Sequence, residues 1–159
     1  MFLCGISTRS LSAISLRLLG HRIAPTEVSE ANREFAEAVE KRRLRDLSTE
    51  TIRYLFIDGV NFRMRVLKQV EIAPVLVAIG VTKTGHKLVV GLQAGSKESA
   101  ANWREFFRDL KQCGLDASQV QLGIMDGLTS LETVYREEFP EAKTQRCQVH
   151  VARNVIAKV

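Results

Sequence analysis

Two patterns of apolar positions follow one another along this chain of 159 residues. From Ser7 to about Asp46 the apolar residues recur every three or four positions, which predicts amphipathic helices. From Arg53 onward, short runs rich in β-branched residues alternate with further helical stretches. The sequence therefore predicts a helical region over residues 1–50 and an α/β domain over residues 51–159.

The helical region is predicted to hold two helices joined by a short turn. Gly20 ends the first and Pro25 opens the second, because glycine suits the end of a helix and proline its first turn. A helix-turn-helix plan can place its second helix in the major groove of DNA, although most helical hairpins only pack. Glutamates on the second helix would repel phosphates, so both interpretations stay open. These glutamates are Glu27, Glu30, Glu34 and Glu37.

A basic cluster follows at the end of the second helix. Its members are Lys41, Arg42, Arg43 and Arg45. Such a cluster is able to contact a nucleic-acid backbone, but a run of charges more often forms a solvated surface. The formal net charge of +5 permits a nucleic-acid partner without requiring one. The four residues are therefore candidate DNA-binding residues.

The α/β domain is predicted to begin with three antiparallel strands and to continue with alternating helices and strands. Residues 54–57 and 62–66 form the first strand across a bulge, and residues 75–81 and 88–92 form a hairpin. Residues 75–81 are apolar throughout, as in strands that are covered on both faces. Helices follow at 98–112, 128–139 and from 148 onward, with strands at 120–125 and 143–147. A right-handed crossover places strand 120–125 parallel to the first strand and beside it.

Asp58 and Asp126 are the candidate catalytic pair. Each ends an apolar run and precedes a glycine, so adjacent parallel strands would bring both carboxylates to one edge of the sheet. Two carboxylates that close repel unless a cation neutralises them, and Mg²⁺ or Mn²⁺ prefers such oxygen ligands. Two such ions can activate an attacking oxygen and stabilise a leaving one. The simpler alternative is that Asp58 only starts a hairpin and Asp126 only caps a helix.

The cysteines and the hydropathy bear on the environment of the protein. Three widely spaced cysteines argue against a disulfide framework and fit a reducing cytoplasm. Cys147 and His150 resemble half of a zinc site, but no second pair with ligand spacing is present. The sequence shows no signal-peptide pattern and no apolar run long enough for a bilayer, so no membrane partner is expected.

With these residues in place, the chain resembles the Mutator-type transposases of bacterial insertion sequences. The ordered combination of matching segments is specific, whereas any one of them would be weak. The segments are 5–9 (GISTR), 56–59 (FIDG), 77–81 (VAIGV), 98–100 (ESA) with Trp103, 125–127 (MDG), 139–140 (FP), and 145–150 (QRCQVH) with Arg153 and Asn154.

The resemblance implies a ribonuclease-H-like catalytic domain in which two Asp and one Glu bind Mg²⁺ or Mn²⁺. Asp58 would be the first acid and Asp126 the second, while Cys147 and His150 match a C-x-x-H signature near the active site. The implied reaction is phosphoryl transfer on DNA, in which water or a 3′-hydroxyl attacks a phosphodiester at the ends of the element. The implied partners are DNA and either further copies of the chain or a full-length transposase, at the bacterial nucleoid.

The resemblance also implies parts that these residues do not supply. Upstream DNA-binding helices would precede Met1, and the third acid would lie downstream of Val159. We therefore expect a transposase truncated at both ends, with a helix-turn-helix-like remnant, an incomplete catalytic domain and little activity of its own. The alternatives are a non-catalytic DNA-binding or inhibitory fragment, and an unrelated α/β nuclease or hydrolase on the same fold.

Overall fold

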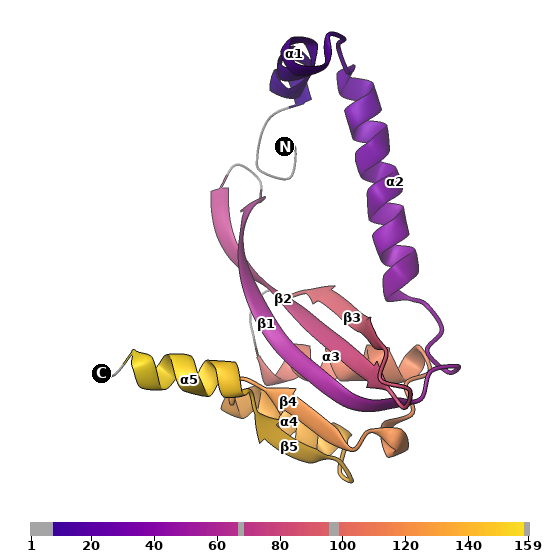
Figure 1. Ribbon diagram of the computed structural model, residues 1–159. Coiled ribbons are helices and arrows are strands. Elements are labelled where there is room, and N and C mark those ends of the chain that lie inside the picture. Colours follow the sequence, from indigo (N-terminus) through magenta and orange to yellow (C-terminus); the bar gives the residue numbers. More distant parts are fainter. Residues whose placement is uncertain (1–7, 67–68, 96–98, 158–159) are drawn as a thin grey trace. The chain divides into compact units, whose positions relative to one another are not determined.

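The computed structural model describes residues 8–66, 69–95 and 99–157, and the chain divides into two compact units between Leu44 and Arg45. In the described residues the first unit consists of α1 (Thr8–Leu19) and α2 (Pro25–Arg43). The second unit combines a sheet with α3 (Ala100–Gln112), α4 (Thr129–Glu138) and α5 (Gln148–Ile156) (Figure 1). The predicted α/β class is confirmed.

The turn between α1 and α2 is held by a side chain of α1. Gly20 ends this helix with a φ of 75°, in the left-handed region that glycine adopts freely. The buried hydroxyl of Ser15 accepts a hydrogen bond from the Ile23 amide at 2.9 Å. Pro25 then begins α2. The predicted end of the first helix and start of the second are therefore confirmed.

A mixed sheet with the strand order β3-β2-β1-β4-β5 forms the second unit. β1, β2 and β3 are antiparallel, whereas β4 is parallel to β1, and β5 is parallel to β4. The predicted antiparallel start and the parallel strand beside the first are confirmed. The strands are β1 (Ile52–Val66), β2 (Gln69–Thr82), β3 (Lys87–Ala94), β4 (Leu122–Met125) and β5 (Lys143–Arg146). The irregularity in β1 lies between Ile52 and Tyr54, and not between the two predicted segments of this strand.

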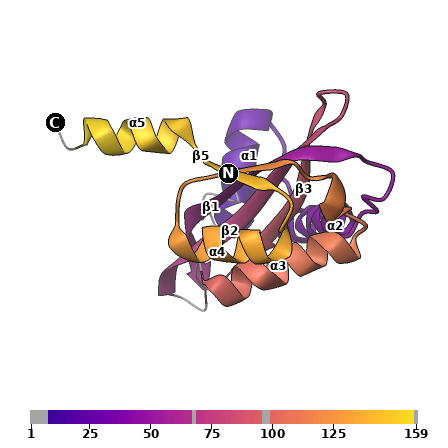
Figure 2. The ribbon, with the colours of Figure 1, turned by 90° about the horizontal axis from the view of Figure 1, so that it is seen from below.

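Two helices cover one face of this sheet. Figure 2 shows α3 and α4 side by side beneath the strands. The ring of Phe107 on α3 meets Tyr135 of α4, with centroids 5.9 Å apart, and Phe139 just after α4 at 5.3 Å. Trp103 and Phe107 are fully buried. This aromatic layer is the centre of the core.

Glycines in the strands let the helices approach the sheet closely. A Cβ placed on Gly91 of β3 would stand 2.7 Å from atoms of both Phe106 and Leu110 on α3. Gly123 of β4 lies in the same way under the ring of Tyr135 on α4. Real Cβ contacts are not this short, so the core requires glycine at both positions.

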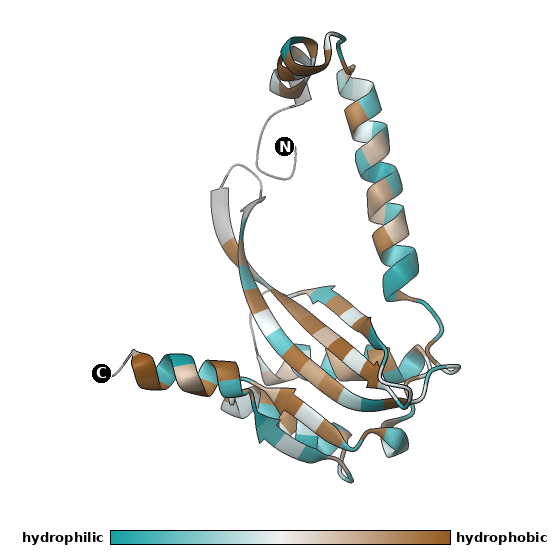
Figure 3. Ribbon diagram, in the orientation of Figure 1, coloured by the Kyte–Doolittle hydropathy of each residue, from teal (hydrophilic) through white to brown (hydrophobic). Residues whose placement is uncertain are grey.

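The opposite face of the sheet is apolar and remains partly exposed. Leu76 and Ala78 of β2 are buried beneath the helices, whereas Ile79 keeps 36% of its surface exposed and Phe56 of β1 keeps 42%. Figure 3 shows the apolar residues along β1 and β2. The prediction that residues 75–81 are covered on both faces is wrong, because both packed helices of this unit lie on the same side. None of the helices in the described part of the chain is long and apolar enough to span a membrane.

Candidate active site

Asp58 and Asp126 occupy equivalent positions on neighbouring parallel strands. Phe56 of β1 pairs with Ile124 of β4, and each aspartate lies two residues further along its chain. Side chains alternate between the two faces of a sheet, so Asp58 shares the face of Phe56, while Asp126 is the first residue after β4. Neighbouring strands are about 4.8 Å apart, so this register is compatible with the predicted pair of carboxylates.

Asp58 lies inside β1 and lines a pocket. It is opposite Val77 of β2 in the middle of the antiparallel ladder, so the alternative that it starts a hairpin turn is wrong. Within the described residues no hydrogen bond or ion pair reaches its half-buried carboxylate. The pocket has a volume of about 180 Å³. Its lining residues are Phe56, Ile57, Asp58, Val77, Ile79, Ile124, Cys147 and His150.

Asp126 shapes the turn that leads from β4 into α4. Its Oδ1 accepts a hydrogen bond from the Leu128 amide at 2.9 Å, which fixes the carboxylate over its own loop. The N-cap of α4 is Leu128, so Asp126 does not cap this helix directly. In the described part of the chain only Oδ1 is engaged, and Oδ2 is available to a ligand.

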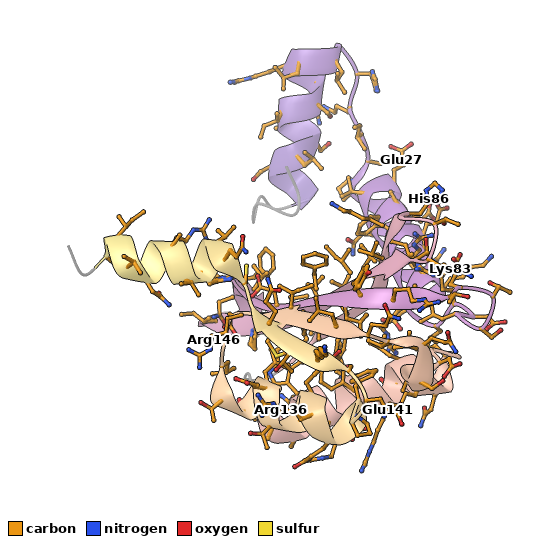
Figure 4. The ribbon with its side chains drawn as sticks, turned by 60° about the horizontal axis from the view of Figure 1, so that its bottom comes forward. Glu27, Lys83, His86, Arg136, Glu141 and Arg146 are labelled. Carbon is orange, nitrogen blue, oxygen red and sulfur yellow. The ribbon has the colours of Figure 1, made fainter. Side chains whose placement is uncertain are left out.

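Arg146 packs against the same turn, a contact that the sequence analysis did not predict. Gly127 has a φ of 93°, and a Cβ there would stand 3.1 Å from Nε of Arg146. Figure 4 labels this arginine near the point where the chain passes from β5 into α5. This contact follows from the pairing of β5 with β4, in which Arg146 is opposite Met125. The side chain of Arg146 therefore lies against the turn that follows Asp126.

Cys147 and His150 lie at the same edge of the sheet. Cys147 follows β5 directly and is the N-cap of α5, and the register of β5 with β4 continues to place it beside Asp126. Hydrogen bonds from the backbone and then the side chain of His150 lower the pKa of the Cys147 thiol, because they stabilise the thiolate. Both residues line the pocket of Asp58. The predicted motif of unknown role thus shares a pocket with the predicted catalytic residue Asp58, whereas Asp126 is not among the residues that line this pocket.

The described residues hold no group of three His, Cys, Asp or Glu side chains that is arranged to bind a metal ion. The candidate ligands for a hard cation remain the predicted pair Asp58 and Asp126. Mg²⁺ often uses only one or two protein carboxylates and keeps several waters, so a pair is a chemically reasonable ligand set.

The basic cluster is divided between the two units, with Arg45 in the second. Arg43 is paired with Glu40 at 2.9 Å, and Nη2 of Arg45 donates a hydrogen bond to the carbonyl of Val89 in β3 at 2.6 Å. Lys41 and Arg42 are exposed on the last turn of α2. Two of the four candidate DNA-binding residues therefore have partners within the chain.

Comparison with known proteins reveals a relationship along the full sequence. Residues 1–159 match the family model described as "Transposase, Mutator family". The chain belongs to this family. The resemblance inferred from the ordered motifs is thereby confirmed.

Curated relatives of this Mutator-family chain are transposases of insertion sequence elements. The transposase for element IS905 of Lactococcus lactis is 31% identical over 100% of the chain and 40% of its own length. The transposase for IS256 in transposon Tn4001 of Staphylococcus aureus is 32% identical over the same shares. The transposase for IS1081 of Mycobacterium tuberculosis is 33% identical over 98% of the chain and 37% of its own length. The chain thus spans about two fifths of these relatives.

Proposed function

We propose that this chain is part of a DNA transposase of an insertion element, in which Asp58 and Asp126 bind divalent metal for phosphoryl transfer on DNA ends. The observation that carries the proposal is the common register of the two aspartates on adjacent parallel strands of a Mutator-family member. The ribonuclease-H-like fold belongs to the same proposal, and the sheet order β3-β2-β1-β4-β5 supports it.

The residues at this edge fit Mg²⁺ or Mn²⁺. Such ions would activate the attacking oxygen and stabilise the leaving oxygen of the phosphodiester. Asp58 would offer a carboxylate with no competing hydrogen bond from the described residues, and the Leu128 amide would hold the carboxylate of Asp126 in place. Phe56 and Ile124 would form apolar walls that limit the access of water to the site.

A third acid belongs to the proposed site but not to the described residues of this chain. Because the chain spans about two fifths of its relatives, we place this acid in a part of the relatives that the chain does not cover. Two carboxylates bind a cation less tightly than three, so this chain would bind metal weakly and show little activity alone. Activity in the bacterial cytoplasm, at the nucleoid, would then need further copies or a full-length transposase.

A titration with Mn²⁺ tests the metal site. The electron paramagnetic resonance signal of free Mn²⁺ falls when the ion binds, and we expect this fall with the unmodified chain. Asp58→Asn and Asp126→Asn should each abolish it, because each removes one of the two charged ligands. Asp116→Asn is the matched control, since Asp116 holds the 3-10 turn η2 (Ala117–Gln119) at the other end of β4. Equal binding by all four proteins would refute the proposal.

A non-catalytic DNA-binding role is the second candidate. The net charge of +5 and the exposed Lys41 and Arg42 on α2 favour it. Binding of this kind would fall steeply as salt rises, because phosphate contacts release counterions. It would also survive Asp58→Asn and Asp126→Asn, which distinguishes it from the metal-dependent role.

A further inference from the structure

β1 and β2 continue beyond the rest of the sheet as a two-stranded ribbon. The pairing of β4 with β1 ends at Phe56, and the pairing of β3 with β2 ends at Val75. β1 and β2 remain paired with each other as far as Val66 and Gln69. Figure 1 shows this part curving away from the other strands. We call residues 62–66 and 69–73 the β-arm.

Three of the described side chains of the β-arm are exposed. Phe62 keeps 49% of its surface exposed on the face of Asp58, while Ile72, which keeps 64%, pairs with the exposed Arg63 on the opposite face. A ribbon of only two strands is marginally stable in water, and this one exposes a large apolar side chain on each face. The arm therefore has the features of an element that is covered by a partner.

The charge of the arm indicates which partner. By its sequence the arm contains two basic residues (Arg63 and Arg65) and one acidic residue (Glu71), a net charge of +1. Two arms packed against each other would bring like charges together, which disfavours a second copy of the chain. A polyanion would instead neutralise them, and the major groove of DNA is wide enough for a two-stranded β-ribbon.

The arm is also continuous with the candidate active site. Asp58 and Phe62 stand four residues apart on β1, and alternation places both on the same face of the sheet. At about 3.3 Å per residue, the separation is about 13 Å along one strand. Duplex DNA that reaches the aspartates would therefore pass along this face of the arm.

We propose that the β-arm binds duplex DNA beside the active site, with Phe62 packing against the DNA on the face of Asp58 and the long side chain of Arg63, on the opposite face, reaching the phosphate backbone past the unpaired edge of β1. The inference rests on the proposed function, which supplies DNA as the substrate. It adds a contact surface that is separate from the metal ligands and from the basic cluster. Backbone and shape contacts of this kind require no particular base sequence.

Fluorescence anisotropy with a fluorescein-labelled duplex of about 30 base pairs, three helical turns, tests the arm. EDTA is present, so that binding does not depend on metal. Arg63→Glu should weaken binding about tenfold and reduce the slope of log affinity against log salt by about 1, since one phosphate contact is lost. Phe62→Ala should weaken binding on the order of tenfold through lost packing. Lys83→Glu is the control, an equal charge change at the exposed β2–β3 turn, and should leave the affinity unchanged (Figure 4).

A change in tryptophan fluorescence on binding complements the expected losses of duplex affinity. In Phe62→Trp an added indole stands on the arm, while the native Trp103 is fully buried in the core and shielded from DNA. Addition of the duplex should change the emission of Phe62→Trp. The emission of Gln112→Trp, where the added indole lies at the exposed end of α3, should stay constant. Constant emission from both variants overturns the proposal. Native Trp103 emission in Arg63→Glu and Phe62→Ala verifies that these proteins are folded.

Mn²⁺ binding by the same variants separates this inference from the proposed function. Arm variants that lose affinity for the duplex and still bind Mn²⁺ support the arm. Unchanged affinity for the duplex in Arg63→Glu and Phe62→Ala refutes the arm, whatever the result for the metal. Absence of duplex binding by the unmodified chain refutes it as well. If the variants instead convert a dimer to a monomer in sedimentation velocity, with duplex affinity unchanged, the arm is an interface between copies and the proposal is wrong.

Discussion

Tyr135 of α4 lies directly over Gly123 of β4, and its ring fills the space that a side chain at position 123 would need. A Cβ on Gly123 would stand 2.7 Å from Cε2 of the ring. The tyrosine is fully buried and its ring stacks on Phe139 with centroids 4.8 Å apart, so it has little room to move. The packing of α4 on the sheet therefore depends on the absence of a side chain at position 123 of β4.

Replacement of Gly123 by alanine should destabilise the fold. We expect Gly123→Ala to lower the free energy of unfolding by about 2–3 kcal/mol, because overpacking forces the ring or the strand to shift. Urea denaturation followed by Trp103 fluorescence measures the change. In a Tyr135→Leu background the same substitution should cost clearly less, since the ring is gone. An equal cost in both backgrounds would contradict the role of this contact.

The hydroxyl of Tyr135 should reduce stability. It is buried and finds no hydrogen-bond partner among the described residues, and burial raises the pKa of this phenol well above its ordinary range. Tyr135→Phe should therefore raise the free energy of unfolding by about 1 kcal/mol, because an unsatisfied polar group is removed from the core. Tyr54→Phe, at a half-exposed position, should have almost no effect. A loss of stability in Tyr135→Phe would show that the hydroxyl has a partner.

Tyr135→Phe should also change the stability of the protein at alkaline pH. Above about pH 10 the phenol ionises in the unfolded chain but stays protonated in the folded one, so the folded state binds more protons. The free energy of unfolding should then fall as pH rises through this range, and Tyr135→Phe should lose part of that fall. Urea denaturation at pH values on both sides of 10 measures the difference.

The thiol of Cys147 should react at lower pH than an ordinary thiol. Hydrogen bonds from His150 lower its pKa, so more of it is thiolate near neutral pH. In a chain with Cys4→Ser and Cys113→Ser, iodoacetamide alkylates only Cys147. The rate of this alkylation should rise at lower pH than the rate of alkylation of glutathione. His150→Ala should move this rise back toward higher pH, though only in part, since backbone amides also contribute. A profile that coincides with that of glutathione would contradict the lowered pKa.

The order of the strands could be predicted because two independent patterns agreed. The alternating and apolar runs gave the strands, and the preference for right-handed crossovers placed β4 beside β1. The same reasoning put Asp58 and Asp126 at corresponding strand positions. Local spacing was sufficient here, since each aspartate follows the apolar run of its own strand.

Other features depended on contacts that local spacing does not contain. The run of residues 75–81 has the same pattern whether one or both faces are covered, so the exposure of Ile79 could not be deduced. The contact of Arg146 with Gly127 requires the register between β4 and β5. The bond of Arg45 to Val89 joins positions far apart in the sequence, and the run of basic residues gave no sign of it.

The hydrogen bond from Arg45 to Val89 affects how the protein behaves at high concentration. β3 is an outer strand, and such a strand offers unpaired backbone groups on which another chain can add. The guanidinium of Arg45 occupies one of its carbonyls and places a positive charge on the border of the sheet. The addition of a strand from another chain is thereby disfavoured at this position of β3.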